Sequence, residues 1–338
     1  MCGMVMLAPR RPAAGHAAVP VTRRRFGRRH FLTGTAGGAA LLGLTACAGE
    51  QAAAPAVMRS IQGASGPVQV PADPQRVVAT DFYTTYALLD VGYTVVGTAQ
   101  ATVGGVLPEY QQAYDAIPKV GTTTDLNYES VVAQRPDLIL GTQVPNLPAG
   151  LAERLGSIAP TVLFEAGTEP GTWQDRAVRT ADAVNRREAA EQLRADYEQK
   201  ARDIGARHAD LLGRMRFGLV RGGQEGTALV DLPNSWSGVV LGAVGARLTA
   251  FAEGRPGASA RLSYEQLGTI DDCDVLLHLA DTRGGVDANT QRMLDAATFR
   301  TLRAVREGRL FPLPNYYVAH YRQGEAVLDE LDSILTSL

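Results

Sequence analysis

The feature that most constrains the fold is a series of short apolar segments alternating with amphipathic stretches, which begins near residue 76 and starts again near residue 216. In the first series, strands are predicted at RVVATD, TVVGTA, DLILGT and TVLFEA, and helices over residues 84–91, at SVVAQRP and at LAERLGSIAP. Strands that are apolar almost throughout and alternate with helices are typical of a parallel sheet covered on both faces. The first series therefore predicts one α/β lobe, preceded by two short strands in MRSIQGASGPVQVP.

The second series repeats this pattern in the C-terminal part of the chain. It predicts strands at RFGLVRGG, ALVDL, DVLLHLA and RLFPLP, and helices at WSGVVLGAVGA and TFRTLRAVREG. The intervening residues 186–212 contain no proline and one glycine, and apolar side chains recur at helical spacing at Ala189, Leu193, Tyr197 and Ile204. We expect two Rossmann-like α/β lobes with parallel-type sheets, over residues 58–185 and 213–338, joined by a single long helix over residues 186–212.

The N-terminal region has the composition of an export signal. Its apolar run, residues 31–46, spans sixteen residues, whereas a transmembrane helix needs about 20. Arg28 and Arg29 precede the run as in twin-arginine signals, and the sequence Leu-Thr-Ala-Cys at its end resembles a bacterial lipoprotein cleavage site. We expect a signal peptide over residues 1–46, lipid attachment at Cys47 and a flexible tether over residues 47–57. The alternative is a buried helix with a chance cysteine.

Removal of the predicted signal changes the charge of the chain. Residues 1–46 hold seven arginines and no acidic residue, so 26 basic and 35 acidic side chains remain, a formal net charge of about −9. This sign disfavours nucleic acid and anionic lipid headgroups as partners. The remaining Cys273 has no cysteine partner once Cys2 is removed and Cys47 is acylated, so the exported protein must be stabilised by burial rather than by a disulfide.

The order of segments resembles the solute-binding lipoproteins of bacterial ABC importers for ferric siderophores, haem and cobalamin. The resemblance covers essentially the whole exported chain and rests on VPADPQRVVATD, VGTTTDLNYESVVAQRPDLILGT, ERLGSIAPTV, RLSYEQLGTIDDCDVLLHLA and FRTLRAVREGRLFPLPNYY. It implies the class III periplasmic-binding-protein fold, with a ligand held between the lobes and little hinge movement. It also implies a monomer, tethered by its lipid to the outer face of the cell membrane, that delivers a ferric siderophore to a permease and ATPase complex.

Two glutamates stand at matching places in the predicted lobes. Glu129 in LNYESVV and Glu265 in LSYEQLG each follow a tyrosine near the start of a short helix. A carboxylate there also stabilises the helix dipole, which is the structural alternative. The resemblance assigns both glutamates to docking on arginines of the permease.

Ligand contacts in the resembled fold come from loops at strand ends that face the cleft. A ferric siderophore is an oxygen-rich chelate, so aromatic walls with hydroxyl, amide or guanidinium donors suit it. The candidates for this role, each of which alternatively serves packing or is a solvated surface group, are Tyr83, Thr123, Gln143, Arg221, Trp236, Arg283, Tyr316 and Tyr317.

The candidate loops carry few cations, which favours a neutral or weakly cationic hydroxamate complex over a highly anionic catecholate. In related hydroxamate carriers an arginine often follows the Val-Gly of the first docking motif, and Thr123 occupies that place here. A haem or cobalamin carrier of the same fold is the alternative, with His320 and the neighbouring tyrosines as axial ligands for haem iron. We expect no enzyme, because neither a Gly-x-Ser-x-Gly elbow nor a Gly-x-x-x-x-Gly-Lys phosphate loop occurs. We also expect no cofactor and no metal site, because the exported chain keeps only three histidines, His208, His278 and His320.

Overall fold

The described part of the chain, residues 57–101, 105–144, 147–166 and 172–338 of a computed structural model, begins with a β-hairpin. Strands β1 (Met58–Gly63) and β2 (Gly66–Pro71) pair antiparallel, as the sequence predicts. The predicted signal peptide and Cys47 lie outside the described residues. Within those residues, no helix is both long enough and apolar enough for a membrane crossing.

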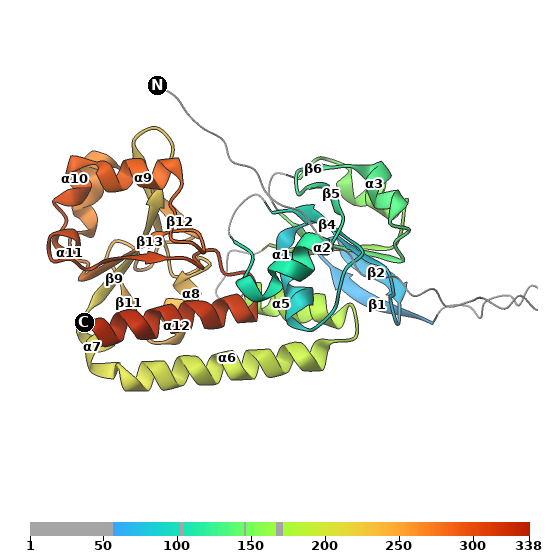
Figure 1. Ribbon diagram of the computed structural model, residues 1–338, viewed down its shortest axis with the longest axis horizontal. Coiled ribbons are helices and arrows are strands. Elements are labelled where there is room, and N and C mark those ends of the chain that lie inside the picture. Colours follow the sequence, from blue (N-terminus) through green and yellow to red (C-terminus); the bar gives the residue numbers. More distant parts are fainter. Residues whose placement is uncertain (1–56, 102–104, 145–146, 167–171) are drawn as a thin grey trace, which may run out of the picture. The chain divides into compact units, whose positions relative to one another are not determined.

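The first lobe is built on a six-stranded sheet with the order β6-β5-β4-β3-β7-β8 (Figure 1). Its strands are β3 (Val77–Ala79), β4 (Gly97–Gln100), β5 (Lys119–Thr122), β6 (Asp125–Leu126), β7 (Leu138–Gln143) and β8 (Thr161–Glu165). All neighbouring pairs are parallel except β5 and β6. The helical segments are α1 (Phe82–Asp90), η1 (Pro108–Tyr110), α2 (Gln111–Ala116), α3 (Tyr128–Ala133), α4 (Leu151–Gly156) and α5 (Thr172–Asp182). The central strands β3 and β7 are buried along almost their whole length, which explains their continuous apolar sequence.

The second lobe contains a second six-stranded sheet, in which β12, β10, β9, β13 and β14 are neighbours in that order and β11 also pairs with β9. Its strands are β9 (Arg216–Gly222), β10 (Thr227–Asp231), β11 (Arg247–Leu248), β12 (Ser259–Ser263), β13 (Val275–Leu279) and β14 (Leu310–Leu313). The helical segments are α8 (Gly238–Ala243), η2 (Tyr264–Ile270), α9 (Ala288–Asp295), α10 (Ala297–Arg300), α11 (Arg303–Arg306) and α12 (Tyr321–Ser337).

One strand of this lobe departs from the predicted parallel arrangement. β10 runs antiparallel to both β9 and β12. Only four residues, 223–226, separate β9 from β10, whereas a parallel connection needs a crossover of about a dozen residues or more. The short Gly-rich connection therefore makes a hairpin.

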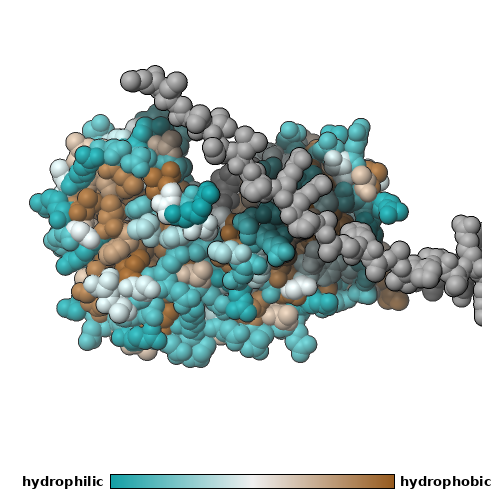
Figure 2. Space-filling model, in the orientation of Figure 1, coloured by the Kyte–Doolittle hydropathy of each residue, from teal (hydrophilic) through white to brown (hydrophobic). Residues whose placement is uncertain are grey.

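The two lobes are linked by α6 (Arg187–Arg207), which ends at His208 and is followed by the short α7 (Ala209–Arg214). The long C-terminal helix α12 lies beside α6 (Figure 1). Their close approach depends on Gly324, because a Cβ there would lie 3.0 Å from side-chain atoms of both Trp173 and Tyr197. On the face shown in Figure 2, hydrophilic side chains gather along the lower edge, where Figure 1 places these two helices.

A buried polar junction fastens α12 to the first lobe. Asp90, at the end of α1, lies 2.8 Å from His320 Nδ1 and accepts hydrogen bonds from the backbone N–H of Arg322 (3.1 Å) and the Tyr110 hydroxyl (2.8 Å). The side chains of Asp90 and His320 are only 2% and 1% exposed. The start of α12 is thereby fixed to a helix of the opposite lobe.

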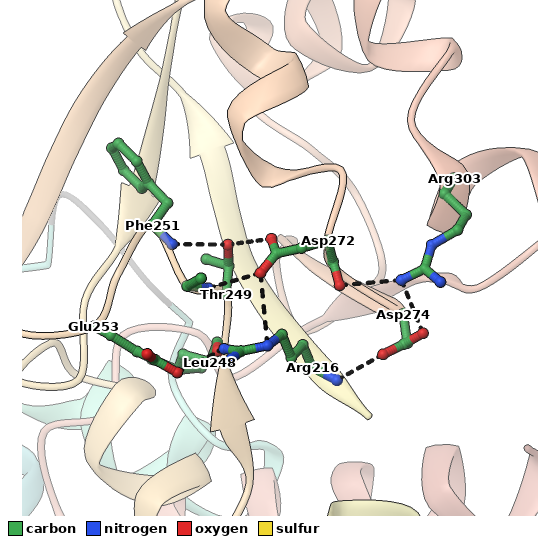
Figure 3. Close-up of polar contacts among 9 residues, drawn as sticks. Arg216, Leu248, Thr249, Phe251, Glu253, Asp272, Asp274 and Arg303 are labelled. Atoms are coloured by element: carbon green, nitrogen blue, oxygen red, sulfur yellow. Dashed lines mark hydrogen bonds and ion pairs between the residues drawn. The ribbon is translucent and has the colours of Figure 1, made fainter. Parts of the chain in front are cut away.

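A second polar network holds the N-terminal ends of β9 and β13 together (Figure 3). Arg216 donates its backbone N–H to Asp274 (2.8 Å) and its guanidinium to the carbonyl of Leu248 (2.7 Å). Arg303 pairs with Asp274 at 2.9 Å, and Asp272 accepts from the Thr249 hydroxyl at 2.5 Å. These bonds tie the segment that follows η2 to the sheet.

Candidate functional site

A cavity of about 580 Å³ lies between the two lobes. The first lobe contributes residues that follow the carboxyl ends of β3, β7 and β8, together with the first turns of α5. The second lobe contributes the segment before and into α8, together with Ala258 just before β12. The lining residues are Tyr83, Thr142, Gln143, Val144, Glu165, Ala166, Thr172, Trp173, Arg176, Asn234, Ser235, Trp236, Val239 and Ala258.

Asp81 organises the first-lobe wall of this cavity. It caps α1 by accepting from the backbone N–H of Thr84 (2.8 Å), and it also accepts from the backbone N–H of Thr142 at the end of β7 (2.5 Å). Burial raises the pKa of Asp81, while these hydrogen bonds and the charge of Arg176 act in the opposite direction. The cap fixes the first turn of α1 and places Tyr83 on the cavity wall.

Arg176 is a buried cation on the cavity wall that the sequence analysis missed. It lies on α5, is 7% exposed, donates to the carbonyl of Ala166 at 2.9 Å and lies 5.2 Å from the ring centre of Tyr83. Burial lowers its pKa, and the nearby Asp81 opposes that shift. Nothing in its sequence neighbourhood, WQDRAVRT, separates it from a surface arginine of an amphipathic helix, because only the tertiary fold turns this face toward the cavity.

On the second-lobe wall, Trp236 lines the cavity with its ring backed by other side chains. Arg221 lies 5.9 Å from the ring centre of Trp236, and Tyr317 packs edge-on against Trp236 at 5.1 Å. Arg221 Nε in turn lies 3.2 Å from Asp231, whose side chain is fully buried. Burial raises the pKa of Asp231 to about 6, with Arg221 acting in the opposite direction.

The candidate ligand residues therefore divide into two groups. Tyr83, Gln143 and Trp236 line the cavity. The others do not line it. Arg221 and Tyr317 lie behind Trp236, and Tyr316 is 1% exposed, with burial raising its pKa well above the usual value. Thr123 lies in the turn between β5 and β6, and the Arg283 side chain is 91% exposed beside Asp281.

The two candidate docking glutamates are both exposed. Glu129 lies in the first turn of α3, at a shallow groove of about 490 Å³ between α3 and α4, where Val132 is 53% exposed. Glu265 lies in the first turn of η2, and a hydrogen bond with Ser263 lowers its pKa. Neither glutamate lines the inter-lobe cavity.

The three histidines of the described region contact different partners and do not form a common site. His208 contacts Asp332 at 2.7 Å, His278 lies in β13 with its Nδ1 3.0 Å from the carbonyl of Leu279, and His320 contacts Asp90. Within the described ranges, no group of three or more His, Cys, Asp or Glu side chains has an arrangement that suits a metal ion. The His320 ring is thus engaged in the lobe junction and does not line the cavity.

Comparisons with known proteins agree with this architecture. A family model described as periplasmic binding protein matches residues 77–317. A probable siderophore-binding lipoprotein of Bacillus subtilis is 28% identical over 181 residues, which is 52% of this chain and 53% of the relative, about half its length. The iron(3+)-hydroxamate-binding protein of the same organism is 25% identical over 75% of this chain and 77% of its own.

Among solved structures, the siderophore periplasmic binding protein from the fuscachelin gene cluster of Thermobifida fusca is similar to this chain, with a TM-score of 0.70 and 28% identity. The superposition covers 80% of this chain and 99% of the other. The Staphylococcus aureus protein complexed with staphyloferrin B has the same fold at 19% identity, with a TM-score of 0.68. The chain belongs to the periplasmic binding protein family, and it is an extracytoplasmic solute-binding protein rather than an enzyme.

Proposed function

We propose that this protein captures a ferric siderophore in the cavity between its lobes and delivers it to an ABC importer. The observation that carries the proposal is the cavity itself, because three aromatic side chains and one buried guanidinium meet there. Aromatic rings provide flat apolar walls for the organic ligand, and a guanidinium donates to the oxygens around the iron. The relatives named for siderophore and iron-hydroxamate binding support the same ligand class.

The charge of the cavity favours a hydroxamate complex. Among the described lining residues, Arg176 is the one arginine or lysine, and Glu165 supplies a carboxylate. A triscatecholate complex carries several negative charges and requires more cations than this wall provides. A neutral or weakly cationic ferric hydroxamate needs only oxygen-directed donors, which Arg176, Gln143 and Asn234 offer.

The rest of the proposal concerns location and partners. The protein is exported through its twin-arginine signal, cleaved before Cys47 and anchored as a monomer by lipid on the outer face of the cell membrane. Glu129 and Glu265 dock on the permease, because both are exposed on helical segments of different lobes and neither lines the cavity. In mass spectra of the membrane fraction, no peptide N-terminal to Cys47 should appear, and a Cys47→Ala form that remained membrane-bound would contradict the anchor.

The ligand proposal is tested by tryptophan fluorescence. Trp173 and Trp236, the two tryptophans of the chain, both line the cavity, so a bound ferric complex should quench both. The purified protein is titrated with a ferric trihydroxamate, a ferric triscatecholate, haem and cobalamin. Saturable quenching by the hydroxamate complex at micromolar concentration or below supports the proposal. Saturation by haem or cobalamin alone, or by none of the four, contradicts it.

A further inference from the structure

One wall of the cavity is supported by the two long helices rather than by a sheet. Trp173, in the first turn of α5, lines the cavity and is 4% exposed. Its ring packs edge-on against Tyr197 of α6, with ring centres 5.6 Å apart, and against Tyr321 at the start of α12, with ring centres 5.4 Å apart. The indole therefore separates the cavity from the α6 and α12 helices.

The two tyrosines behind the indole are held in place. Tyr197 and Tyr321 are each 1% exposed, and neither lines the cavity. The Tyr321 hydroxyl accepts a hydrogen bond from Nε of Arg194 (2.7 Å) and donates one to the carbonyl of Gln174 (3.1 Å). These bonds join α12, α6 and α5 at the place where Trp173 packs, so the support behind the indole is rigid.

Gly324, one turn into α12, is the position that lets the indole lie this close to the helices. A Cβ there would lie 3.0 Å from Trp173 Cη2 and 3.0 Å from Tyr197 Cε2. Carbon atoms pack at about 3.5–4.0 Å, so a side chain at this position must displace one of the two rings. Alanine is otherwise preferred to glycine inside a helix, which gives this glycine a packing reason.

Of the two rings, Trp173 is the one with room to move. Tyr197 is enclosed between helices, whereas Trp173 borders the cavity. A methyl group at position 324 would therefore push the indole by a few tenths of an ångström toward the cavity. The ligand space would become shallower on this side.

We propose that Gly324 determines how large a ligand the cavity accepts, as a positioning residue that acts through Trp173. Without a side chain at position 324, the indole lies back against α6 and α12, and the cavity keeps its depth. The proposal rests on the proposed function for the identity of the ligand, a ferric hydroxamate, but the position of the indole does not depend on it. Size selectivity is thereby assigned to α12, which contributes none of the described lining residues.

The first test is Gly324→Ala, titrated with two ferric hydroxamates of different size. The larger is the ferric complex of a linear trihydroxamate, and the smaller is ferric tris(acetohydroxamate), which has the same iron coordination without connecting chains. The Kd of the larger complex should rise about tenfold, the effect of one methylene in an apolar pocket, and that of the smaller should change less than about twofold. An equal loss of affinity for both complexes contradicts size selection.

The matched control is Gly213→Ala on α7. A Cβ at position 213 meets no atom within 4 Å, so this variant adds the same methyl group to a helix without displacing a ring. Its affinity for both complexes should equal that of the wild type.

A double variant tests whether the effect passes through Trp173. Trp173→Phe shortens the ring that the new methyl group would meet, so adding Gly324→Ala to it should change the Kd of the larger complex less than about twofold. An equal loss in the Trp173→Phe and wild-type backgrounds contradicts the positioning role. Should Gly324→Ala alone fail to fold, the double variant should fold and bind, and its failure to do so places the clash elsewhere.

The last readout needs no ligand. In a Trp236→Phe background, Trp173 is the one remaining tryptophan, and acrylamide should quench its fluorescence more strongly after Gly324→Ala but not after Gly213→Ala. Unchanged quenching contradicts the displacement of the indole, whatever the protein binds. Stronger quenching in a protein that binds neither complex would support the position of Trp173 and refute the proposed ligand.

Discussion

At the scale of single residues, the wall of the cavity depends on a buried arginine. Arg176→Gln removes the cation that we propose for the ligand oxygens and leaves Asp81 buried without its nearest opposite charge. We expect affinity for a ferric hydroxamate to fall about 10- to 100-fold and the free energy of unfolding to fall by about 1–3 kcal/mol. Titration and urea denaturation measure the two effects separately.

The control for this substitution lies one turn further along the same helix. Arg179 donates to the carbonyl of Gln62 and does not line the cavity. Arg179→Gln should leave ligand affinity within about twofold of the wild type, since it removes a solvent-accessible group. Equal affinity in wild type and Arg176→Gln would place the ligand elsewhere.

Glu330 on α12 predicts a dependence of stability on pH. Burial raises its pKa from 4.5 to about 7, while a hydrogen bond of 2.7 Å from the Asn315 side-chain amide opposes that shift. The folded protein then binds this proton more tightly than the unfolded chain does, so ionisation favours unfolding. Stability is therefore lost as pH rises from about 4.5 to about 7.

Glu330→Gln should relieve this loss. Within the described residues, Glu330 Oε2 and Asn315 Oδ1 are both buried without a hydrogen-bond partner, and a glutamine amide can donate to the asparagine oxygen. We expect the variant to be more stable than wild type by about 1 kcal/mol at pH 8 and to lose this advantage at pH 4.5. Thermal unfolding at both values measures it, with Glu325→Gln, whose partner is Arg322, as the control. A gain that is independent of pH would contradict the assignment.

At the scale of elements, the junction between α1 and α12 should contribute more to the free energy of unfolding than the exposed ion pairs along α6 do. Asp90→Ala leaves His320, Tyr110 and the N–H of Arg322 without their acceptor in a buried place. We expect a loss of about 2–4 kcal/mol in the free energy of unfolding by urea.

Asp329→Ala provides the matched comparison, because it also removes an aspartate contact of α12. Its pair with Lys200 at 2.6 Å is exposed, with 67% of the Asp329 side chain accessible. The loss there should stay below about 0.5 kcal/mol. Similar losses in the two variants would show that the junction is no stronger than a surface pair.

The elements themselves were largely predictable from sequence, for a physical reason. Strands such as LILGTQ and FGLVRG are buried on both faces, so their composition alone separates them from the helices. The direction of β10 was not predicted, because the same apolar pattern serves a parallel or an antiparallel neighbour. The short connection between β9 and β10 determines the antiparallel direction, because it is too short for a parallel crossover.

The residues of the candidate site were harder to predict from the sequence than the fold was. Three of the predicted ligand residues do line the cavity: Tyr83, Gln143 and Trp236. They could be predicted because each lies near the end of a strand or just before a helix, where ligand contacts were expected. Arg176 lies on a helix face, and no local signal distinguishes a cavity-facing arginine from a solvated one. Arg283, in a Gly-flanked loop, had the expected loop position but lies exposed.

At the scale of the whole molecule, ligand binding and delivery to the permease should depend on different residues, so that one can be lost without the other. The double variant Glu129→Ala with Glu265→Ala should bind siderophore as wild type does, because neither side chain lines the cavity. It should nearly abolish uptake in cells, since an ion pair at a partly desolvated interface contributes about 2 kcal/mol or more and two are lost.

The control pair for docking is Glu188→Ala with Glu198→Ala, two exposed glutamates on α6. Uptake should continue in that variant at close to the wild-type rate. If the Glu129 and Glu265 variant instead loses ligand affinity tenfold while its fold is intact, the glutamates belong to ligand binding and not to docking.

Ligand binding between the lobes is tested most directly by the position of iron in a crystal of the protein with a ferric trihydroxamate. The anomalous signal of iron locates the metal without reference to the organic ligand. We predict one peak inside the inter-lobe cavity, bounded by Tyr83, Arg176 and Trp236. A peak outside this cavity in protein saturated with the complex, or full quenching in solution with iron bound on another surface, would contradict it.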